Sequence, residues 1–383
     1  MRRALVIIAP ALLLLACTGG KSNVEPPSPL VKFTPTAKVK KIWSTDIGKG
    51  EKKKIITLAP ALDGNVLYTT DPAGRVSALA ADTGRDKWRV KTDEPAGAVG
   101  FGEGLVLLGT KKGEVIAMDR ENGDVRWRAT LSSEVLVAPS ASNGVVVAQT
   151  IDGKVFALSA QDGKQLWSQQ RAVPALSLHG TSTPVIYRGL VFAGFASGKI
   201  TAVELETGRL VWERAVAYPR GRSEIERLID VDAPPLLTGD SLFAASYQGR
   251  IVAINIENGR VRWSRELSTY SGMVADDRNV YVTNAAGDVL ALDQGSGAAL
   301  WKQDKLRARI LNGPAVTGKY VVVGDIQGYV HWLLKENGRF AARSRLRGGA
   351  IRGRMIAADN TLFVQGQGGV VAALRVEPRP TRN

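Results

Sequence analysis

One short sequence pattern recurs along this chain and constrains its fold more than any other feature. A glycine is followed by Val or Ile two positions later and by Ala four positions later; a second glycine and a tryptophan lie ten and fourteen positions after the first. Successive first glycines are 38 to 51 residues apart, a period typical of a propeller or a solenoid. The six complete copies start at Gly74, Gly113, Gly153, Gly198, Gly249 and Gly287.

The residues inside one copy predict the kind of repeat. In the third copy, β-rich runs at 145–148, 154–158 and 165–167 are separated by Asp-Gly turns, which are typical of hairpins because glycine supplies the positive φ that such turns need. We expect a further strand at 136–138. Four strands in about 40 residues form a propeller blade. The sequence therefore predicts an all-β, eight-bladed β-propeller with four-stranded blades.

The chain ends predict how the ring closes. A seventh copy starts at Gly328 but has Ala342 in place of the tryptophan, and an eighth starts at Gly369 and ends before its last strand. The segment around Trp43 is a tryptophan strand with no strand before it, so we expect it to pair with the C-terminal blade, which removes two open sheet edges. Seven tryptophans are expected to pack between blades: Trp43, Trp88, Trp127, Trp167, Trp212, Trp263 and Trp301.

The N-terminus predicts an envelope protein. Two arginines precede an apolar run at 4–16 that is too short to span a bilayer, which is typical of a signal peptide. The four residues ending at Cys17, the only cysteine, resemble a bacterial lipobox. We therefore expect a signal peptide at 1–16, lipidation at Cys17, a proline-containing tether at 17–41, the propeller at 42–376 and a tail at 377–383. Thr18 in place of Asp favours the outer membrane, with the protein facing the periplasm.

The formal charge of +15 suits an anionic partner or surface, but no aromatic stripe accompanies the basic residues. This argues against nucleic-acid binding and favours a solvated basic surface.

A resemblance to known proteins narrows the prediction. The phrase from Ala202 to Trp212 resembles the repeat of pyrroloquinoline-quinone (PQQ) propellers, a superfamily of quinoprotein dehydrogenases and non-enzymatic lipoproteins. With its lipobox, its tether and eight repeats, the chain resembles the BamB family of outer-membrane protein assembly lipoproteins. That resemblance implies a non-enzymatic scaffold without a cofactor. Its expected partners are the POTRA region of the insertase BamA and the outer membrane, and unfolded outer-membrane proteins are a further candidate, reached through exposed blade edges.

Two long connections between blades are the candidate partner-binding site. The distance from tryptophan to the next first glycine is 31 residues after Trp167 and 37 after Trp212, against 24 to 27 after most others. Both are the same connection in adjacent blades, so we expect them to lie side by side on one face. Long loops in a compact repeat fold are often functional. The alternative is that their leucines are buried in a strand and their aspartates cap turns.

Residue roles in these loops follow from the resemblance to the BamB family. The phrases at 176–184 and 223–235 match segments that contact the POTRA region in that family. His179 departs from the family pattern, where Arg is usual, which puts a permanent charged contact there in doubt. The candidate partner-binding residues are Leu176, Leu178, His179, Arg227, Asp230 and Asp232.

Two other functions stay open on the sequence alone. A PQQ-dependent periplasmic dehydrogenase would resemble this fold, but the chain lacks an adjacent cysteine pair, and its two histidines, His179 and His331, lie three repeats apart. Asp230 and Asp232 provide too few oxygen ligands for an EF-hand-like calcium site. We therefore expect no catalytic residue and no metal. The second alternative is a binding module for anionic envelope polymers.

Overall fold

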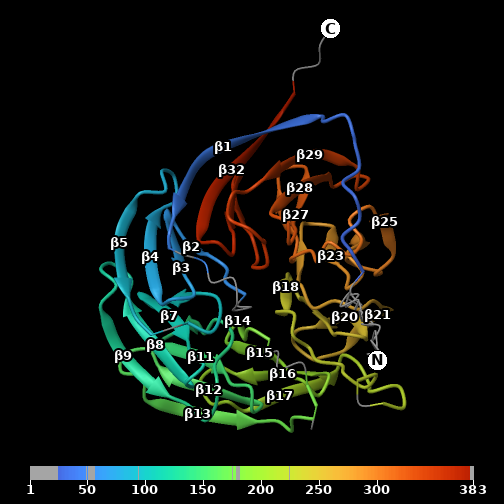
Figure 1. The fold of residues 1–383 in the computed structure, drawn as a ribbon. Coiled ribbons are helices and arrows are strands. Elements are labelled where there is room, and N and C mark those ends of the chain that lie inside the picture. Colours follow the sequence, from blue (N-terminus) through green and yellow to red (C-terminus); the bar gives the residue numbers. More distant parts are fainter. Residues whose placement is uncertain are drawn as a thin grey trace, which may run out of the picture.

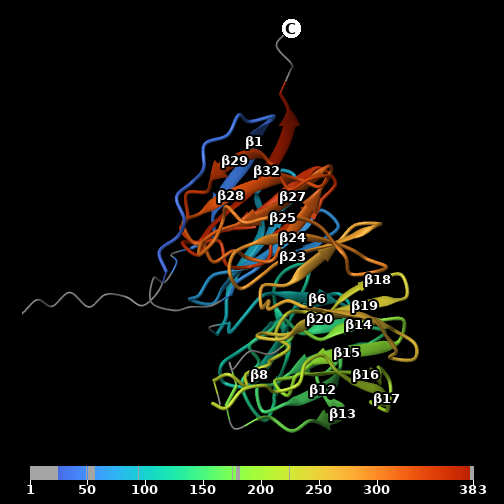
Figure 2. The same ribbon diagram turned by 90° about the vertical axis from the view of Figure 1, so that its right-hand side faces the viewer.

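The chain forms a closed ring of eight four-stranded antiparallel sheets around a central axis (Figures 1 and 2), which confirms the predicted eight-bladed propeller. This computed structural model describes residues 25–48, 50, 57–93, 95–174, 176–177, 182–223 and 225–379. Within those ranges the regular secondary structure is entirely β, and no helix is present that could cross a membrane. The predicted signal peptide and Cys17 lie outside the described residues.

We number the blades in chain order, and within each blade the strands run from the axis outward. Blades 1 to 4 consist of β2 (Ala61–Asp63), β3 (Val66–Thr70), β4 (Arg75–Ala80) and β5 (Asp86–Lys91); β6 (Gly100–Gly102), β7 (Leu105–Gly109), β8 (Glu114–Asp119) and β9 (Val125–Thr130); β10 (Ser140–Ser142), β11 (Val145–Gln149), β12 (Lys154–Ser159) and β13 (Gln165–Gln170); and β14 (Val185–Tyr187), β15 (Leu190–Gly194), β16 (Lys199–Glu204) and β17 (Leu210–Ala215).

The remaining blades follow the same order, except that the last takes its outer strand from the N-terminus. Blades 5 to 8 consist of β18 (Leu236–Thr238), β19 (Ser241–Ala245), β20 (Arg250–Asn255) and β21 (Val261–Glu266); β22 (Met273–Ala275), β23 (Asn279–Thr283), β24 (Val289–Asp293) and β25 (Ala299–Gln303); β26 (Ala315–Thr317), β27 (Tyr320–Gly324), β28 (Tyr329–Leu334) and β29 (Phe340–Arg345); and β30 (Ile356–Ala358), β31 (Thr361–Gln365), β32 (Val370–Pro378) and β1 (Ala37–Asp46).

The ring closes as the chain ends predicted. The blue strand β1 lies beside the red strand β32 in Figure 1, and Trp43 faces Ala373 across the pair. The pairing is longer than expected, because it extends from Ala37 opposite Pro378, whereas the sequence placed the start of the propeller at 42. Residues 37–41 therefore belong to the sheet. A long closing pair holds the two ends of the ring with more backbone hydrogen bonds.

The prediction of a strand at 136–138 is wrong. The first strand of blade 3 is β10, in which Ser140 pairs with Val147, and the apolar run before it belongs to the connection from blade 2. Leu136 and Val137 line the central cavity instead of pairing. Apolar side chains in this run are partly buried at the axis, so hydrophobicity alone gave the wrong position for the strand.

Successive blades are joined by a contact between a tryptophan and a glycine. The Trp167 ring of blade 3 lies against Gly208 in the turn before the last strand of blade 4, and its indole N–H donates to the carbonyl of Leu205 at 2.8 Å. Gly208 has a φ of +69°, and a Cβ there would lie 2.7 Å from the indole. The same contact recurs for Trp43 with Gly84, Trp88 with Gly123, Trp127 with Gly163, Trp212 with Gly259, Trp263 with Gly297 and Trp301 with Gly338.

No fourth-strand tryptophan lies between blades 7 and 8; instead residues 25–36, which we call the strap, pack on the outer strand of blade 7. Phe33 stacks on Phe340 with ring centroids 5.3 Å apart, and the Arg343 guanidinium lies 5.0 Å from the Phe33 centroid. The backbone N–H of Thr36 donates to the carbonyl of Ala341. The strap thus packs along the outer side of blade 7 before it enters β1.

A buried cluster of polar side chains on blade 7 and the connection before it is hydrogen-bonded to the strap. Asp325 accepts hydrogen bonds from Arg309 at 2.7 Å and from Nε2 of His331 at 3.0 Å, and Arg309 also donates to the carbonyl of Ser28 in the strap. Burial lowers the pKa of His331. Since Nδ1 of that ring accepts from Arg343, the geometry fits a neutral imidazole with its proton on Nε2. His331 is therefore structural.

Candidate partner-binding face

The topology of the blades gathers the long connections on one face. Because the strands of each blade alternate in direction, the connections between blades share a face with the turns between second and third strands. Backbone hydrogen bonds join the two sets, for example from Val231 to the carbonyl of Phe195 and from Ile351 to that of Asp325. We call this side the loop face.

Two long connections in adjacent blades meet on the loop face: 171–184, between β13 and β14, and 216–235, between β17 and β18. The hydroxyl of Ser182 donates to the carbonyl of Ala233, a contact between the two connections. Ser182 is fully buried. The expected adjacency of the two insertions is therefore present in the structure.

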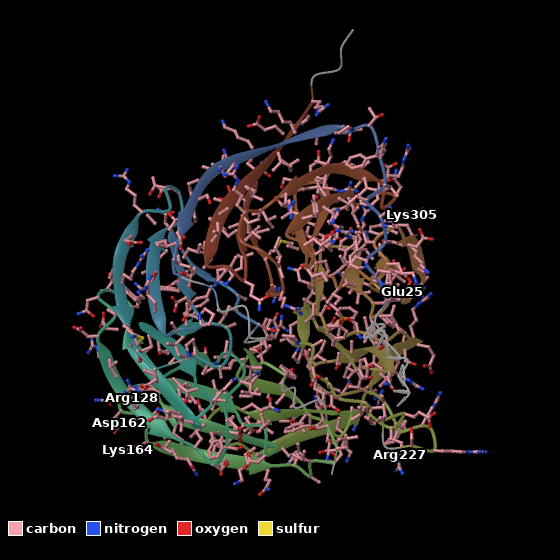
Figure 3. All side chains as sticks on the ribbon, viewed as in Figure 1. Glu25, Arg128, Asp162, Lys164, Arg227 and Lys305 are labelled. Carbon is pink, nitrogen blue, oxygen red and sulfur yellow. The ribbon has the colours of Figure 1, made fainter. Side chains whose placement is uncertain are left out.

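The outer part of the second connection is an exposed turn held by one carboxylate. Glu226 accepts the backbone N–H groups of Arg222 and Ser223 at 2.7 and 3.1 Å, and the Ser223 hydroxyl accepts the N–H of Glu226. These backbone hydrogen bonds lower the pKa of Glu226. Ser and Glu three positions apart are the sequence signature of such a reciprocal cap. The turn presents Ile225 and Arg227 to solvent, and Figure 3 shows Arg227 at the edge of the molecule.

The inner part of the same connection is wedged between blades 4 and 5. Leu228, Ile229 and Val231 are 9%, 4% and 1% exposed, and the carbonyl of Asp230 accepts the N–H of Tyr247 from blade 5. The Asp230 side chain is only 1% exposed. Direct contact of Asp230 with a partner would therefore require this loop to move, and the sequence-based assignment of Asp230 to the partner-binding site stays a prediction.

Asp232 lies where this connection reaches the axis. It is one of the residues that line the central cavity, and its buried Oδ1 accepts no hydrogen bond from the described part of the chain. Burial, and then the nearby charge of Asp230, raise the pKa of Asp232 to about 7. A carboxyl held in this way is half protonated at neutral pH.

Exposed apolar side chains accompany these loops. Leu176 is 41% exposed, Tyr218 66% and Ile225 67%. The sequence analysis named Leu176 but missed Tyr218 and Ile225, although each is an isolated apolar residue in the polar run 218–227. Leu178 and His179 lie outside the described residues, so their expected roles stay predictions.

The described residues contain no group of three or more His, Cys, Asp and Glu side chains placed to hold a metal ion. The loop face exposes Leu176, Tyr218 and Ile225 and carries exposed arginines; tyrosine and arginine are enriched at the cores of protein interfaces.

Comparison with solved structures shows the fold class of the protein. The eight-bladed ring matches the solved structure of the quinohemoprotein alcohol dehydrogenase ADHIIG from Pseudomonas putida with a TM-score of 0.71 at 15% identity, covering 90% of this chain and 78% of that chain. At that identity the likeness shows only the fold, that of a β-propeller.

The family follows from closer matches. The model of a family described as outer membrane protein assembly factor BamB matches residues 31–99, 72–303 and 285–378, and the chain belongs to that family. It is 40% identical to BamB of Pseudomonas aeruginosa, over 97% of this chain and 98% of the relative, and 33% identical to BamB of Escherichia coli, over 96% and 98%. The crystal structure of BamB from Moraxella catarrhalis matches with a TM-score of 0.80 at 28% identity, covering 88% of this chain and 99% of that one.

Proposed function

We propose that this chain is a lipid-anchored scaffold in outer-membrane protein assembly, and that its loop face binds the periplasmic POTRA region of the insertase BamA. The observation that carries the proposal is the pair of adjoining long connections, which expose Leu176, Tyr218 and Ile225. Relatives aligned along nearly the whole chain are named outer membrane protein assembly factors. A role of this kind needs a surface and no catalytic group.

The chemistry of the loop face suits a mixed apolar and acidic partner surface. Arg222 and Arg227 flank Ile225 in the exposed turn, and Arg220 extends from the same connection toward Glu266 at 3.6 Å. Apolar anchors would supply most of the binding energy, whereas the arginines would select a partner of complementary charge and speed its encounter. Buried Asp230 and the Glu226 cap hold the turn in the binding conformation.

The strap supports an orientation with the loop face near the membrane. Glu25, at its start, pairs with Arg307 in the connection between blades 6 and 7, at 2.9 Å, and the Ser28 hydroxyl donates to the carbonyl of Lys305 in the same connection. Glu25 lies eight positions after Cys17 in the sequence. At full extension this stretch spans about 28 Å. A lipid on Cys17 would therefore keep the loop face close to the inner surface of the outer membrane.

The proposal is tested by pull-down from detergent-solubilised envelopes. The wild type should retrieve the insertase, and the double variant Leu176→Ala with Ile225→Ala should lose at least about tenfold in retrieval, since two exposed apolar anchors contribute of the order of 1 kcal/mol or more each. The matched control is Leu166→Ala, because Leu166 is 52% exposed at the start of β13, on the opposite side of blade 3.

Three outcomes are informative. Loss of retrieval in the double variant, with normal circular dichroism and normal retrieval by the control, supports the proposed face. Normal retrieval by the double variant keeps the function and rejects the site. Failure of the wild type to retrieve the insertase rejects the proposed function.

A further inference from the structure

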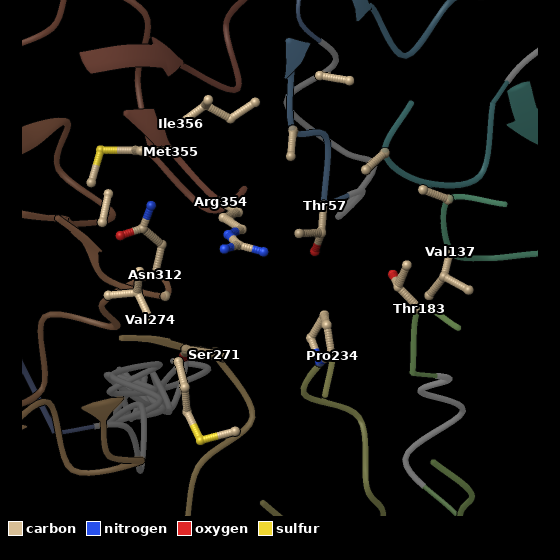
Figure 4. Close-up of a pocket in the computed structure, with 18 of the residues that line it drawn as sticks. Thr57, Val137, Thr183, Pro234, Ser271, Val274, Asn312, Arg354, Met355 and Ile356 are labelled. Carbon is tan, nitrogen blue, oxygen red and sulfur yellow. The ribbon is translucent and has the colours of Figure 1, made fainter. Parts of the chain in front are cut away.

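A cavity of about 980 Å³ lies on the axis of the propeller. Its wall is formed by the short inner strands of the blades and by the connections that reach the axis, including Thr183 and Pro234 from the two long connections (Figure 4). The volume is at the upper end of the range typical of small-molecule sites. The wall is mostly apolar, so its few charged groups dominate what it can bind.

Two arginines face this cavity because of an alternating segment between β29 and β30. Ile351 and Met355 are 0% and 1% exposed and pack between blades, and Gly353 is buried between them. Arg352 and Arg354, at the positions between, therefore both face the cavity. Figure 4 shows the Arg354 side chain extended toward the open centre.

The backbone that carries the arginines is fixed from both sides. The Asn312 amide donates to the carbonyl of Gly353 at 2.7 Å and its oxygen accepts the N–H of Gly324. A Cβ on Gly353 would lie 1.7 Å from the carbonyl oxygen of Leu58, so only glycine allows this close approach. The two guanidinium groups are thus presented by a rigid support, which lowers the entropic cost of binding a ligand.

Neither arginine has a carboxylate counter-ion among the residues that the structure describes. Within the described ranges, Arg354 forms no ion pair or hydrogen bond, and the Nε of Arg352 is buried without a hydrogen-bond partner. The Arg354 side chain is exposed within the cavity, and an arginine stays charged at any physiological pH. The other titratable groups in the wall are Asp232, Tyr187 and Tyr270, so the cavity carries a net positive charge.

We propose that the axial cavity is a binding site for a compact oxyanion, a ligand with a carboxylate or phosphate group held by Arg352 and Arg354. Guanidinium groups form paired N–H hydrogen bonds with either group, and two of them in an apolar wall favour a ligand with more than one negative charge. The apolar remainder of the wall would contact the body of the ligand. This site is separate from the exposed turn on the loop face and does not depend on the proposed partner.

Isothermal titration of the full chain in detergent at low ionic strength tests the site, with succinate as the carboxylate probe and inorganic phosphate as the other. We expect saturable binding of at least one probe, and the probe that binds more tightly identifies the group. Arg354→Gln should weaken that binding at least about tenfold. The matched control, Arg347→Gln, changes an exposed arginine in the same connection and should bind as the wild type does.

Circular dichroism and thermal unfolding would establish that each variant is folded. If Arg354→Gln does not fold, Arg354→Lys takes its place. Lysine keeps the charge but loses the paired donors, so the affinity for the probe should fall by less than in Arg354→Gln. The proposal is overturned if neither probe binds the wild type, or if the Arg354 and Arg347 variants lose binding equally, because the effect would then be one of general surface charge.

Discussion

Trp332 and Ala342 face each other across β28 and β29 in the reverse of the arrangement in the other seven blades. In those blades an alanine of the third strand faces the tryptophan of the fourth, as Ala157 faces Trp167. In blade 7 the tryptophan stands on the third strand and the alanine on the fourth. Trp332 is 1% exposed and packs in the core shared by blades 7 and 8.

The exchange of tryptophan and alanine in blade 7 is explained by the way the ring closes. A fourth-strand tryptophan lies against the glycine turn between the third and fourth strands of the next blade. Blade 8 has no such turn, because its third and fourth strands, β32 and β1, come from opposite ends of the chain. A tryptophan at 342 would have no glycine to cover, and the space beside it is taken by Ala37 and the strap.

Trp332→Ala should lower the free energy of unfolding by about 3–5 kcal/mol, the usual cost of removing a buried indole. Adding Ala342→Trp should not restore stability, because the new ring meets a packed interface. Urea unfolding followed by tryptophan fluorescence and circular dichroism measures both. Recovery of wild-type stability in the double variant would contradict the explanation from ring closure.

The contact between Trp167 and Gly208 predicts a difference between two glycines with similar backbones. Gly208 and Gly144 have φ of +69° and +73°, but a Cβ on Gly144 meets nothing within 4 Å. Gly144→Ala should cost about 1 kcal/mol, for the left-handed backbone alone. Gly208→Ala should cost about 1–3 kcal/mol more, for overpacking against the indole.

Urea unfolding of both glycine variants gives the comparison, and the Trp167→Ala background provides its control. With the ring removed, the two glycine substitutions should cost the same. If both glycine substitutions lower the free energy of unfolding equally in the wild-type background, the indole does not restrict the space at position 208.

The fold was predictable because the repeat places the same residues in every blade. Gly153, Ala157 and Trp167 each have a local physical requirement, and the closing strand at Trp43 followed from a missing partner at the C-terminus. The position of β10 was not predictable in this way. Inner strands are three residues long, and their apolar neighbours, such as Leu136, are partly buried at the axis without pairing.

The candidate site was predictable only in outline. Loop lengths indicated that the connections at 171–184 and 216–235 lie together, and the contact from Ser182 to Ala233 shows that they do. Burial inside a loop was not predictable, because Asp230 and Arg227 look alike in sequence as charged loop residues. Asp230 lies in the run 228–231, which is buried between blades, whereas Arg227 precedes that run and is exposed to solvent.

Phe33→Ala should release the strap without unfolding the propeller. The stacked Phe33–Phe340 pair contributes about 0.5–1.5 kcal/mol beyond its buried area, so opening of the strap should increase several-fold. Trypsin cleavage after Lys32, which is exposed on the strap, measures that opening by mass spectrometry. Phe101→Ala, at a 38% exposed phenylalanine on blade 2, is the control. Unchanged cleavage in the Phe33 variant would show that the ring does not hold the strap.

Asp232→Asn should stabilise the protein, and more so at high pH. The folded pKa of Asp232 is about 7, above the value of about 3.9 in an unfolded chain. Between these pH values the unfolded chain binds fewer protons than the folded one, so the charge of Asp232 destabilises the fold progressively as pH rises through this window. The cost is absent below about pH 4 and complete above about pH 7.

We expect Asp232→Asn to gain about 1–2 kcal/mol more at pH 8 than at pH 4, less than the full shift implies because the partly exposed carboxyl keeps some hydration. Urea unfolding at the two pH values measures this, and Asp82→Asn, at an exposed turn, should show no such difference. A buried carboxyl that costs stability at neutral pH is a feature that proteins retain at functional sites. Equal gains at both pH values would contradict the buried charge and would remove this reason to connect Asp232 with function.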